Sequence, residues 1–242
     1  MALHHNPSYL HHRTGTPRTE IIREVIFGME DGMVSTMGAI TGIAAGTQNH
    51  FTVVLAGFVI IAVESISMAV GSYLSNKSEK EIDDRKMQEE REELVNFPHE
   101  EKKELEDMYV KDGWPKELAP QMAEAASQNH ELFLQEMAYR ELRIIPDDTS
   151  TPLHNGIAMG VSYVVGGSVA LVPYIILPTI AVATPVSIGL TLIALFILGA
   201  ATTRYSGRAW WKAGLEMLLL ASAAALVGFL VGRAIDTWWL HQ

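Results

Sequence analysis

The residues best able to do chemistry in this sequence are carboxylates inside long apolar segments. A transmembrane helix needs about 20 mostly apolar residues, and an ionisable group within one costs about 2.5–3.5 kcal/mol on insertion scales. Such groups therefore mark functional sites by default. The first two apolar segments carry several such acids, and one methionine lies a helical turn beyond the last of them. The candidates are Glu20, Glu24, Glu30, Asp31, Glu64 and Met68.

Asp31 is the most deeply placed acid of the first segment. It lies about ten residues inside, which at 1.5 Å per residue is roughly 15 Å, near the middle of a bilayer. Met33 and Met37 follow it, and the spans contain no Lys or Arg at comparable depth. Carboxylates suit hard divalent cations and thioethers add affinity for softer metals, which favours an iron-like ion over sodium or magnesium. A cation or proton pathway is the functional interpretation. Pairing of Asp31 or Glu64 with a hydroxyl or a neighbouring helix, to fix packing, is the structural alternative.

A second group of acids lies between the second and third apolar segments. Two pairs of glutamates are spaced three residues apart, and Met137 and Glu141 lie one turn apart, so that each pair can share a helix face. Helices that present carboxylates to a common seam resemble the multi-metal sites of helical bundles. The alternative is that these Glu-rich helices are solvated faces with salt bridges. The candidate ligands are Glu90 and Glu93, Glu101 and Glu104, and Glu136, Met137 and Glu141.

The charge of the chain is concentrated in this same region. Residues 77–148 contain 21 of the 28 acids and 11 of the 18 Lys and Arg residues, so they carry the entire formal net charge of −10. Such a surface attracts cations. It argues against a nucleic-acid partner, which needs clustered Lys and Arg. The absence of cysteine excludes disulfides, thiolate metal sites and cysteine nucleophiles.

Five apolar stretches position these residues, and they predict an all-α membrane protein with five transmembrane helices. Lys and Arg precede the first span, occur throughout the insert and follow the fourth span, whereas the connections at 47–50 and 178–185 have none. The positive-inside rule then places the N-terminus and the insert in the cytoplasm and the C-terminus outside. The stretches are about Ile21–Gly46, Phe51–Leu74, Leu153–Leu177, Thr184–Ala201 and Ala209–Ile235.

The insert between the second and third spans predicts three cytoplasmic helices. Residues 76–96 contain no Gly or Pro, so the second span can continue through them as one helix. Pro98 suits the start of a second helix, which ends near 111, and a third runs from Pro115 or Glu117 to about Ile144. The predicted organisation is a polar tail at 1–19, transmembrane helices 1 and 2 at 20–75, an acidic helical metal-binding module at 76–150 and transmembrane helices 3–5 at 151–242.

Small residues four apart recur in the spans. This spacing lets helices approach closely in lipid, and it predicts helix packing or dimerisation. The pairs are Gly28 and Gly32, Gly42 and Gly46, Gly156 and Gly160, and Gly228 and Gly232.

Two segments resemble the vacuolar iron transporter family, which occurs in plants, fungi and, as homologues, in prokaryotes. They are EIIREVIFGMEDGMVSTMGAITG in the first span and SISMAVGSYLSNKSEKE at the end of the second. The resemblance extends over roughly residues 19–235, with five spans and one insert in the same order. It implies a homodimeric exporter of ferrous iron, often also of manganese, from the cytosol in exchange for protons. The path would lie at the dimer interface, between the two first spans.

The resemblance also implies roles for individual residues. The acid and the methionine that line the family's path match Asp31 and Met68, and acids at its cytoplasmic entrance match Glu20 and Glu24. The family's cytoplasmic metal-binding module matches at Glu90, Glu93, Glu101, Glu104, Met137 and Glu141.

The chain departs from the family pattern at several positions. Glu30 and Glu64 stand where small residues are usual, and Ile60 stands where the family has an acid. Glu136 and Ala138 flank Met137 in place of paired methionines, and the spacing from Met137 to Glu141 is one residue longer than in the family.

The sequence thus predicts a proton-coupled transporter that moves ferrous iron, or manganese, out of the cytosol. Ions would collect on the module and reach Asp31. Protonation of Asp31 or Glu64 from outside would release them, because a carboxylate does not hold a proton and a metal equally well. The alternative is a membrane-anchored metal sensor or storage protein without transport. An enzyme is not expected, because the insert lacks the Glu-x-x-His motif of di-iron sites.

The expected partners are divalent metal ions, protons, the lipid bilayer and a second copy of the chain. Ferrous or manganous ion is expected as cargo, with no prosthetic group and no catalytic residue. The expected location is the plasma membrane of a prokaryote.

Overall fold

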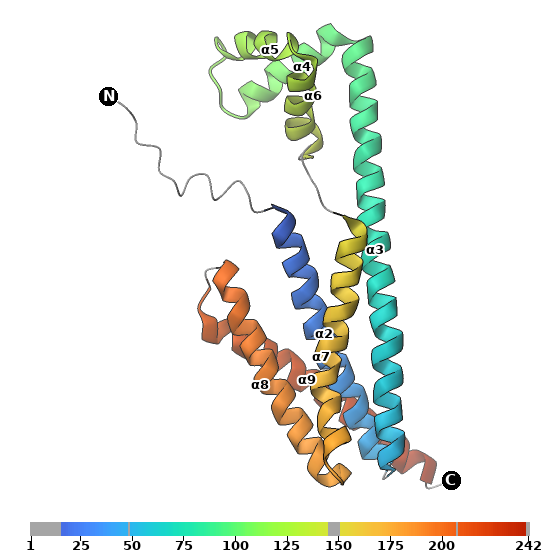
Figure 1. Ribbon diagram of the computed structural model, residues 1–242. Helices are drawn as coiled ribbons and strands as arrows, with labels where there is room; N and C mark the ends of the chain where they lie inside the picture. The colour runs from blue at the N-terminus through green and yellow to red at the C-terminus, as the bar shows by residue number, and fades with distance from the viewer. Residues whose placement is uncertain (1–15, 48, 145–150, 207, 241–242) are drawn as a thin grey trace. The chain divides into compact units, whose positions relative to one another are not determined.

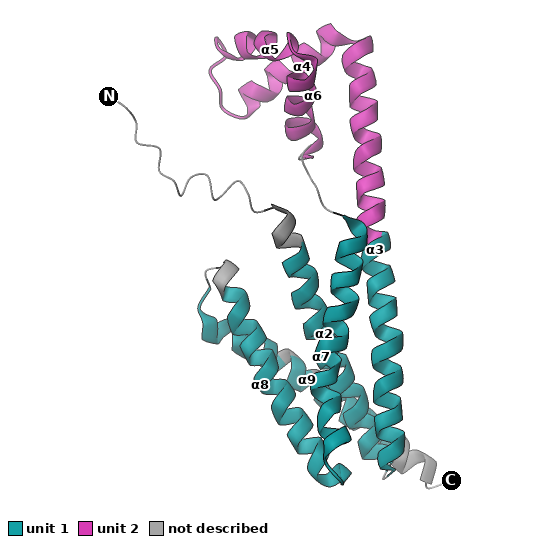
Figure 2. Cartoon of the chain, in the orientation of Figure 1, with its two compact units in different colours: residues 1–74, 150–242 teal, residues 75–149 magenta. Residues whose placement is uncertain are grey.

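The computed structural model describes residues 16–47, 49–144, 151–206 and 208–240, and within these ranges all regular structure is helical (Figure 1). The predicted all-α class is therefore confirmed. The chain divides into two compact units, one of residues 1–74 with 150–242 and one of residues 75–149 (Figure 2).

The first unit contains the apolar helices. Prolines or polar turns separate them. The helices are α2 (Thr16–Gly46), the N-terminal part of α3 (His50–Asn96), α7 (Pro152–Ile176), α8 (Ile180–Ser206) and α9 (Trp210–Leu240).

Four described helices are long and apolar enough to cross a membrane: α3, α7, α8 over Ile180–Thr203 and α9 over Trp210–Gly232. The α2 helix has 31 residues, which is sufficient length, but it also carries the acids described above and is not among the four. The chain is an integral membrane protein by these helices, and its fifth span stays a prediction.

Close helix contacts through glycine hold the first unit together. A methyl group on Gly28 of α2 would lie 2.6 Å from the backbone oxygen of Met159 on α7, and one on Gly42 would lie 2.6 Å from the backbone oxygen of Gly228 on α9. Any side chain larger than hydrogen would separate these helices. The predicted glycine pairs thus act as packing positions within one chain.

The second unit consists of the C-terminal part of α3 followed by shorter helices. As the lack of Gly and Pro predicted, α3 runs unbroken from His50 to Asn96, and α4 (Pro98–Lys111) begins with a proline in its first turn. The remaining elements are α5 (Ala119–Ser127), α6 (His130–Met137) and a π-helical turn, η1 (Ala138–Leu142).

The prediction of one helix from Pro115 or Glu117 to Ile144 is wrong. The structure breaks this segment at residues 128–129, because the Asn129 side chain accepts hydrogen bonds from the backbone N–H groups of Glu131 and Leu132 and begins α6. Asparagine is among the best N-cap residues, so it competes with continuation of the preceding helix.

Each helix of the second unit contributes to one apolar core. Leu94 of α3, Leu105 and Tyr109 of α4, and Phe133 of α6 are buried against the alanines of α5. On α4 the buried positions recur every four residues, which is the period of one helix face. This stripe determines which acids of the unit point inward.

Candidate metal centre

Three carboxylates meet in the second unit. Glu90 of α3, Glu101 of α4 and Glu141 of η1 each offer an oxygen atom, and these three atoms lie within 4.8 Å of one another. Like charges do not gather at this separation without compensation, and a shared cation or a shared proton supplies it.

The apolar stripes of the helices bring the first two acids inward. Glu90 lies one turn before buried Leu94, and Glu101 lies one turn before buried Leu105, so each acid continues the core-facing side of its helix. Glu90 is only 1% exposed and Glu101 only 8%, whereas Glu141 lies on the exposed side of the cluster.

The third acid is positioned by the π-helical turn. Glu141 is the fourth of the five residues of η1. A π-turn accommodates an inserted residue within a helix, and such turns are frequent at functional sites.

The environment of the cluster favours protonated carboxyls when no cation is bound. Burial, and then the charges of Glu141 and Glu101, raise the pKa of Glu90 to about 8. Burial, followed by the charges of Glu104 and Glu93, raises the pKa of Glu101 to about 7. Burial and the charge of Glu104 also raise the pKa of Glu141, against a hydrogen bond from Glu90 that lowers it.

One atom of the cluster lacks a hydrogen-bonding partner. The Oε1 atom of Glu90 is buried and accepts no hydrogen bond within the described part of the chain. Leaving such an oxygen unpaired costs about 1–3 kcal/mol or more. A divalent cation between the three carboxylates would satisfy this oxygen, and an all-oxygen ligand set suits a hard or borderline divalent ion.

The structure separates the other predicted ligands from this cluster. Glu93 and Glu104 are exposed and act on it through their charges. Met137 is fully buried in the apolar core of the unit, which also contains Leu105 and Phe133. Packing in this core accounts for the residue without a metal.

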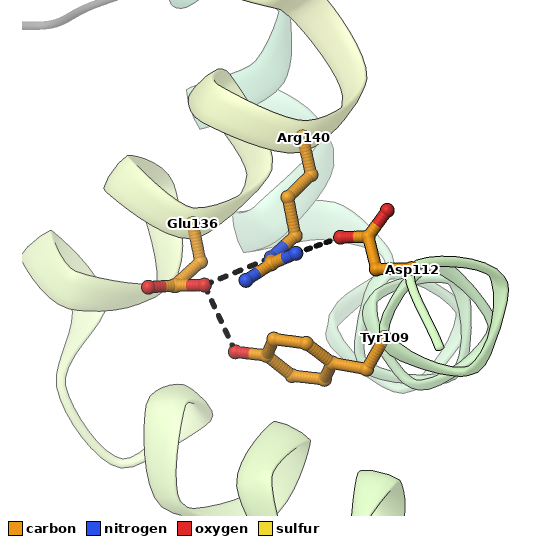
Figure 3. A network of polar contacts seen from close by, with 4 residues as sticks. All are labelled: Tyr109, Asp112, Glu136 and Arg140. Carbon is orange, nitrogen blue, oxygen red and sulfur yellow. Dashed lines mark hydrogen bonds and ion pairs between the residues drawn. The ribbon is translucent and has the colours of Figure 1, made fainter. Parts of the chain in front are cut away.

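Glu136 belongs to a different polar network (Figure 3). Its Oε2 atom accepts hydrogen bonds from Arg140 Nε and Tyr109 Oη, both at 3.0 Å, and Arg140 also pairs with Asp112. The Arg140 guanidinium carbon lies 4.5 Å from the centre of the Tyr109 ring. Burial, then the charge of Glu136, raises the pKa of Tyr109 to about 12, so its hydroxyl remains a donor. The network fastens η1 to the C-terminal end of α4.

In the first unit, the carboxylates of Asp31 and Glu64 have no hydrogen-bond or ion-pair partner among the described residues. Asp31 is half-buried and Glu64 is exposed, and their charges are close enough to interact. The backbone oxygen of Asp31 accepts a hydrogen bond from Ser35 Oγ, which lies 2.6 Å from the buried Tyr163 hydroxyl. The alternative in which a hydroxyl or a neighbouring helix pairs with these carboxylates to fix packing therefore gains no support.

The remaining predicted path residues have distinct environments. Glu24 is buried, and its carboxylate accepts a hydrogen bond from Ser72 Oγ at 2.9 Å and contacts Arg23 at 3.3 Å. Met68 is half-buried on α3, one turn from Glu64. The side chain of Glu20 lies outside the described residues.

The two methionines that follow Asp31 are core residues. Met33 and Met37 are at most 1% exposed and pack in the apolar core of the first unit. The interpretation that they accompany Asp31 as soft ligands is not supported, because Met33 is two and Met37 six residues further along the helix, and neither spacing brings a side chain onto the face of Asp31.

Comparison with known proteins identifies the family of this chain. The sequence profile described as the VIT family matches residues 22–233. The chain belongs to the VIT family. It is 30% identical over 218 residues to vacuolar iron transporter 1 of Arabidopsis thaliana, covering 90% of this chain and 87% of the relative. It is 28% identical to vacuolar iron transporter 1 of Oryza sativa subsp. japonica, covering 97% and 91%. It is 27% identical to the vacuolar iron transporter of Plasmodium berghei (strain Anka), covering 89% and 82%.

Membership of the VIT family makes metal-ion transport across a membrane the activity of this chain, with iron suggested as the ion. These relatives are named for the vacuole. The expectation of a prokaryotic plasma membrane gains no support from them.

The sequence argument missed two charged residues that lie near candidate site residues. Glu30 is half-buried on α2 near the charge of Glu216 on α9, and Glu216 forms an ion pair with Arg208 at 3.0 Å. Glu216 is one of the few acids outside the insert, and that rarity could have identified it. Arg140 is the other missed residue. Its position directly before the candidate ligand Glu141 could have indicated a supporting network.

Proposed function

We propose that this VIT-family chain is a proton-coupled exporter of ferrous iron, with manganese as a second substrate, and that it works as a homodimer. The observation that carries the proposal is Asp31, a half-buried carboxylate in an apolar bundle with no hydrogen bond or ion pair among the described residues. A purely structural acid would have acquired a partner, because an unpaired charge in such a place is costly.

The second unit would collect the cation. Its carboxylates Glu90, Glu101 and Glu141 provide an oxygen cluster, and exposed Glu93 and Glu104 add negative charge around it. Because two of these carboxyls have pKa values near or above neutrality, loading the cluster would release protons. We place this unit and the N-terminus in the cytoplasm from the distribution of Lys and Arg.

In the membrane unit the ion would pass Glu20 and Glu24 and reach Asp31 and Met68. Glu64 lies within electrostatic range of Asp31. A proton arriving from the non-cytoplasmic side on either carboxylate would weaken cation binding and favour release. Exchange of metal for protons follows from this competition.

The exposed face of α3 supports the homodimer. Glu64 lies there among apolar side chains that are at least half exposed in the single chain, such as Val59, Val63 and Ile66. A carboxylate facing lipid is costly, whereas a second copy could enclose it together with Asp31 in a shared path.

The test uses the full chain in proteoliposomes with a metal-sensitive dye inside. Ferrous or manganous ion is added outside, with and without a pH gradient. We expect Asp31→Asn and Asp31→Ala to abolish flux, and Glu216→Gln on α9, which removes an acid already paired with Arg208, to retain most of it. Undiminished flux in both Asp31 variants would refute the proposal.

A sensor or storage protein is the second candidate function. The observation that favours it is that the carboxylate cluster is complete within residues 75–149. This candidate predicts saturable metal binding to the full chain, lost in Glu90→Gln, together with no flux in the same liposomes.

A further inference from the structure

The first turn of α3 contains a histidine in an unusual environment. His50 is the first residue of α3, and Asn49 caps the helix by accepting a hydrogen bond from the Thr52 backbone N–H at 3.1 Å. The cap fixes the backbone that carries the imidazole. His50 is therefore a rigidly mounted group at the end of a membrane-spanning helix.

Both ring nitrogens of His50 face backbone carbonyl oxygens. Nδ1 lies 3.2 Å from the oxygen of Pro178, and Nε2 contacts the oxygen of Tyr174. A carbonyl oxygen only accepts hydrogen bonds, and a neutral imidazole has only one N–H. Both contacts become hydrogen bonds only when the ring is protonated on both nitrogens.

The Tyr174 carbonyl also needs a donor. The Tyr174 oxygen belongs to the last turn of α7, where the next amide of the helical pattern would come from residue 178, a proline without an N–H. The preceding amide, of Leu177, already bonds to Pro173 at 2.9 Å. A cation is moreover favoured at a helix C-terminus by the helix dipole.

We propose that His50 is a proton-binding site that, when protonated, fastens the start of α3 to the end of α7. Loss of one proton leaves one of the two carbonyls without its donor and loosens the junction. The side from which the proton comes, the non-cytoplasmic side, rests on the orientation given under Proposed function. The protonation itself does not.

The site is electrically isolated. Residues 37–63 and 164–203 contain no Asp, Glu, Lys, Arg or further His, so α2, α3, α7 and α8 bring no other charged group to this end. Tyr174 is the one other titratable side chain there, and its hydroxyl donates to Thr184 Oγ1 at 3.0 Å. On α9, Arg233 and Asp236 have side chains outside the described residues. A pH response of this junction within the described helices therefore belongs to His50.

The test exploits the absence of native cysteine. Phe51→Cys on α3 and Ile176→Cys on α7 place spin labels at two positions, each 72% exposed, beside the two sides of the junction. Distance distributions are measured on the full chain in lipid nanodiscs from about pH 5 to 8. We expect a narrow, short-distance population in acid that falls about threefold by the upper end, as for a charge at a partly exposed helix terminus.

Two substitutions of the histidine and one control decide the outcome. His50→Gln should lose the pH response. His50→Arg, which carries permanent charge and several donors, should hold the acid distribution at every pH. His154→Gln, at the other end of α7, should behave like the parent. A pH response that persists in His50→Gln, or a parent pair with no response, would overturn the proposal.

The spectroscopic readout separates this inference from the transport proposal. A pH-dependent junction in a chain without metal flux would leave the His50 site standing and refute only the exporter. Flux without a pH-dependent junction would do the reverse. In a transporting chain, we further expect His50→Gln to change the dependence of flux on the pH of the receiving side and His154→Gln to leave it unchanged.

Discussion

Glu90→Gln should strengthen the second unit when no metal is bound. The side chain is 1% exposed, and burial with nearby negative charge raises its pKa from 4.5 to about 8. At pH 7 the folded protein therefore keeps a proton that an unfolded Glu has lost. Linkage over this interval corresponds to about 3 kcal/mol of destabilisation. Glutamine is neutral, nearly the same size and able to donate to Glu141, so we expect a gain of about 1–3 kcal/mol in local stability.

The pH dependence of this gain has a definite sign. Below about pH 4 the Glu90 carboxyl is protonated in both folded and unfolded chains, so the variant and the parent should not differ. As the pH rises from 4.5 to about 8, the parent loses stability relative to the variant, and above that interval the difference is constant.

Metal should reduce this advantage. The variant lacks one of three carboxylates, and we expect its affinity for Mn²⁺ to fall by at least about tenfold. At 100 times the parent's dissociation constant, binding stabilises the parent by about 2.7 kcal/mol and a variant of tenfold weaker affinity by only about 1.4 kcal/mol. The variant is thus expected to be the more stable protein without metal and to lose at least about 1.3 kcal/mol of that advantage when metal is added.

The assay is hydrogen exchange of the full chain in detergent, followed in peptides of α4, because a single unfolding temperature is poorly defined for two units. Glu92→Gln is the matched control. It lies two residues away on the exposed side of the same helix, where its carboxylate accepts from Gln88 at 2.8 Å, and it should change stability by less than about 0.5 kcal/mol. Weaker α4 protection in Glu90→Gln than in the parent at pH 7–8 without metal would refute the reasoning.

Three further outcomes follow from the same contacts. Metal affinity of the parent, measured by titration calorimetry, should rise steeply with pH between about 6 and 8, because Glu90 and Glu101 must lose protons with pKa values of about 8 and 7; a flat profile would contradict the cluster. Arg140→Gln should loosen η1 by about 1–3 kcal/mol and weaken metal binding, detected as faster exchange around Glu141, whereas unchanged exchange would show that the network does not position it. Tyr163→Phe removes the hydroxyl that contacts Ser35, the residue bonded to the backbone of Asp31, and should raise the KM for metal transport. Tyr174→Phe also removes a buried hydroxyl and should cost a similar 1 kcal/mol or so without that effect; equal KM values would show that Tyr163 does not position Asp31.

The helical class was predictable because it depends on composition over long stretches. Long apolar runs indicated the helices α3, α7, α8 and α9, and the missing Gly and Pro after the second span indicated the continuation of α3. The break at Asn129 was not predicted, because an N-cap acts through one side chain and barely alters the surrounding pattern. Local hydrogen bonds of this kind are invisible to periodicity alone.

The candidate site was predictable only in part, for a related reason. Spacing identifies acids that share a helix face, but it does not say which face is buried. Leu94 and Leu105 decide this for Glu90 and Glu101, and that stripe can be read from the sequence. Glu141 is positioned in the cluster by a π-turn, which has no simple sequence signal. Glu136 lies outside the cluster and accepts a hydrogen bond from Arg140 instead.

In the proposed function, the two acidic sites hold a cation without trapping it. A fully paired carboxylate, like Glu136 in its network with Arg140 and Tyr109, has its oxygens satisfied and offers little to an ion. A fully exposed one binds weakly, because water competes. Glu90 and Asp31 lie between these extremes: each is at least half-buried, each is near another acid, and each lacks a cationic partner in the described chain. In that state a proton and a metal ion are the two available sources of compensation, so the proton concentration on each side of the membrane can determine which of them is bound.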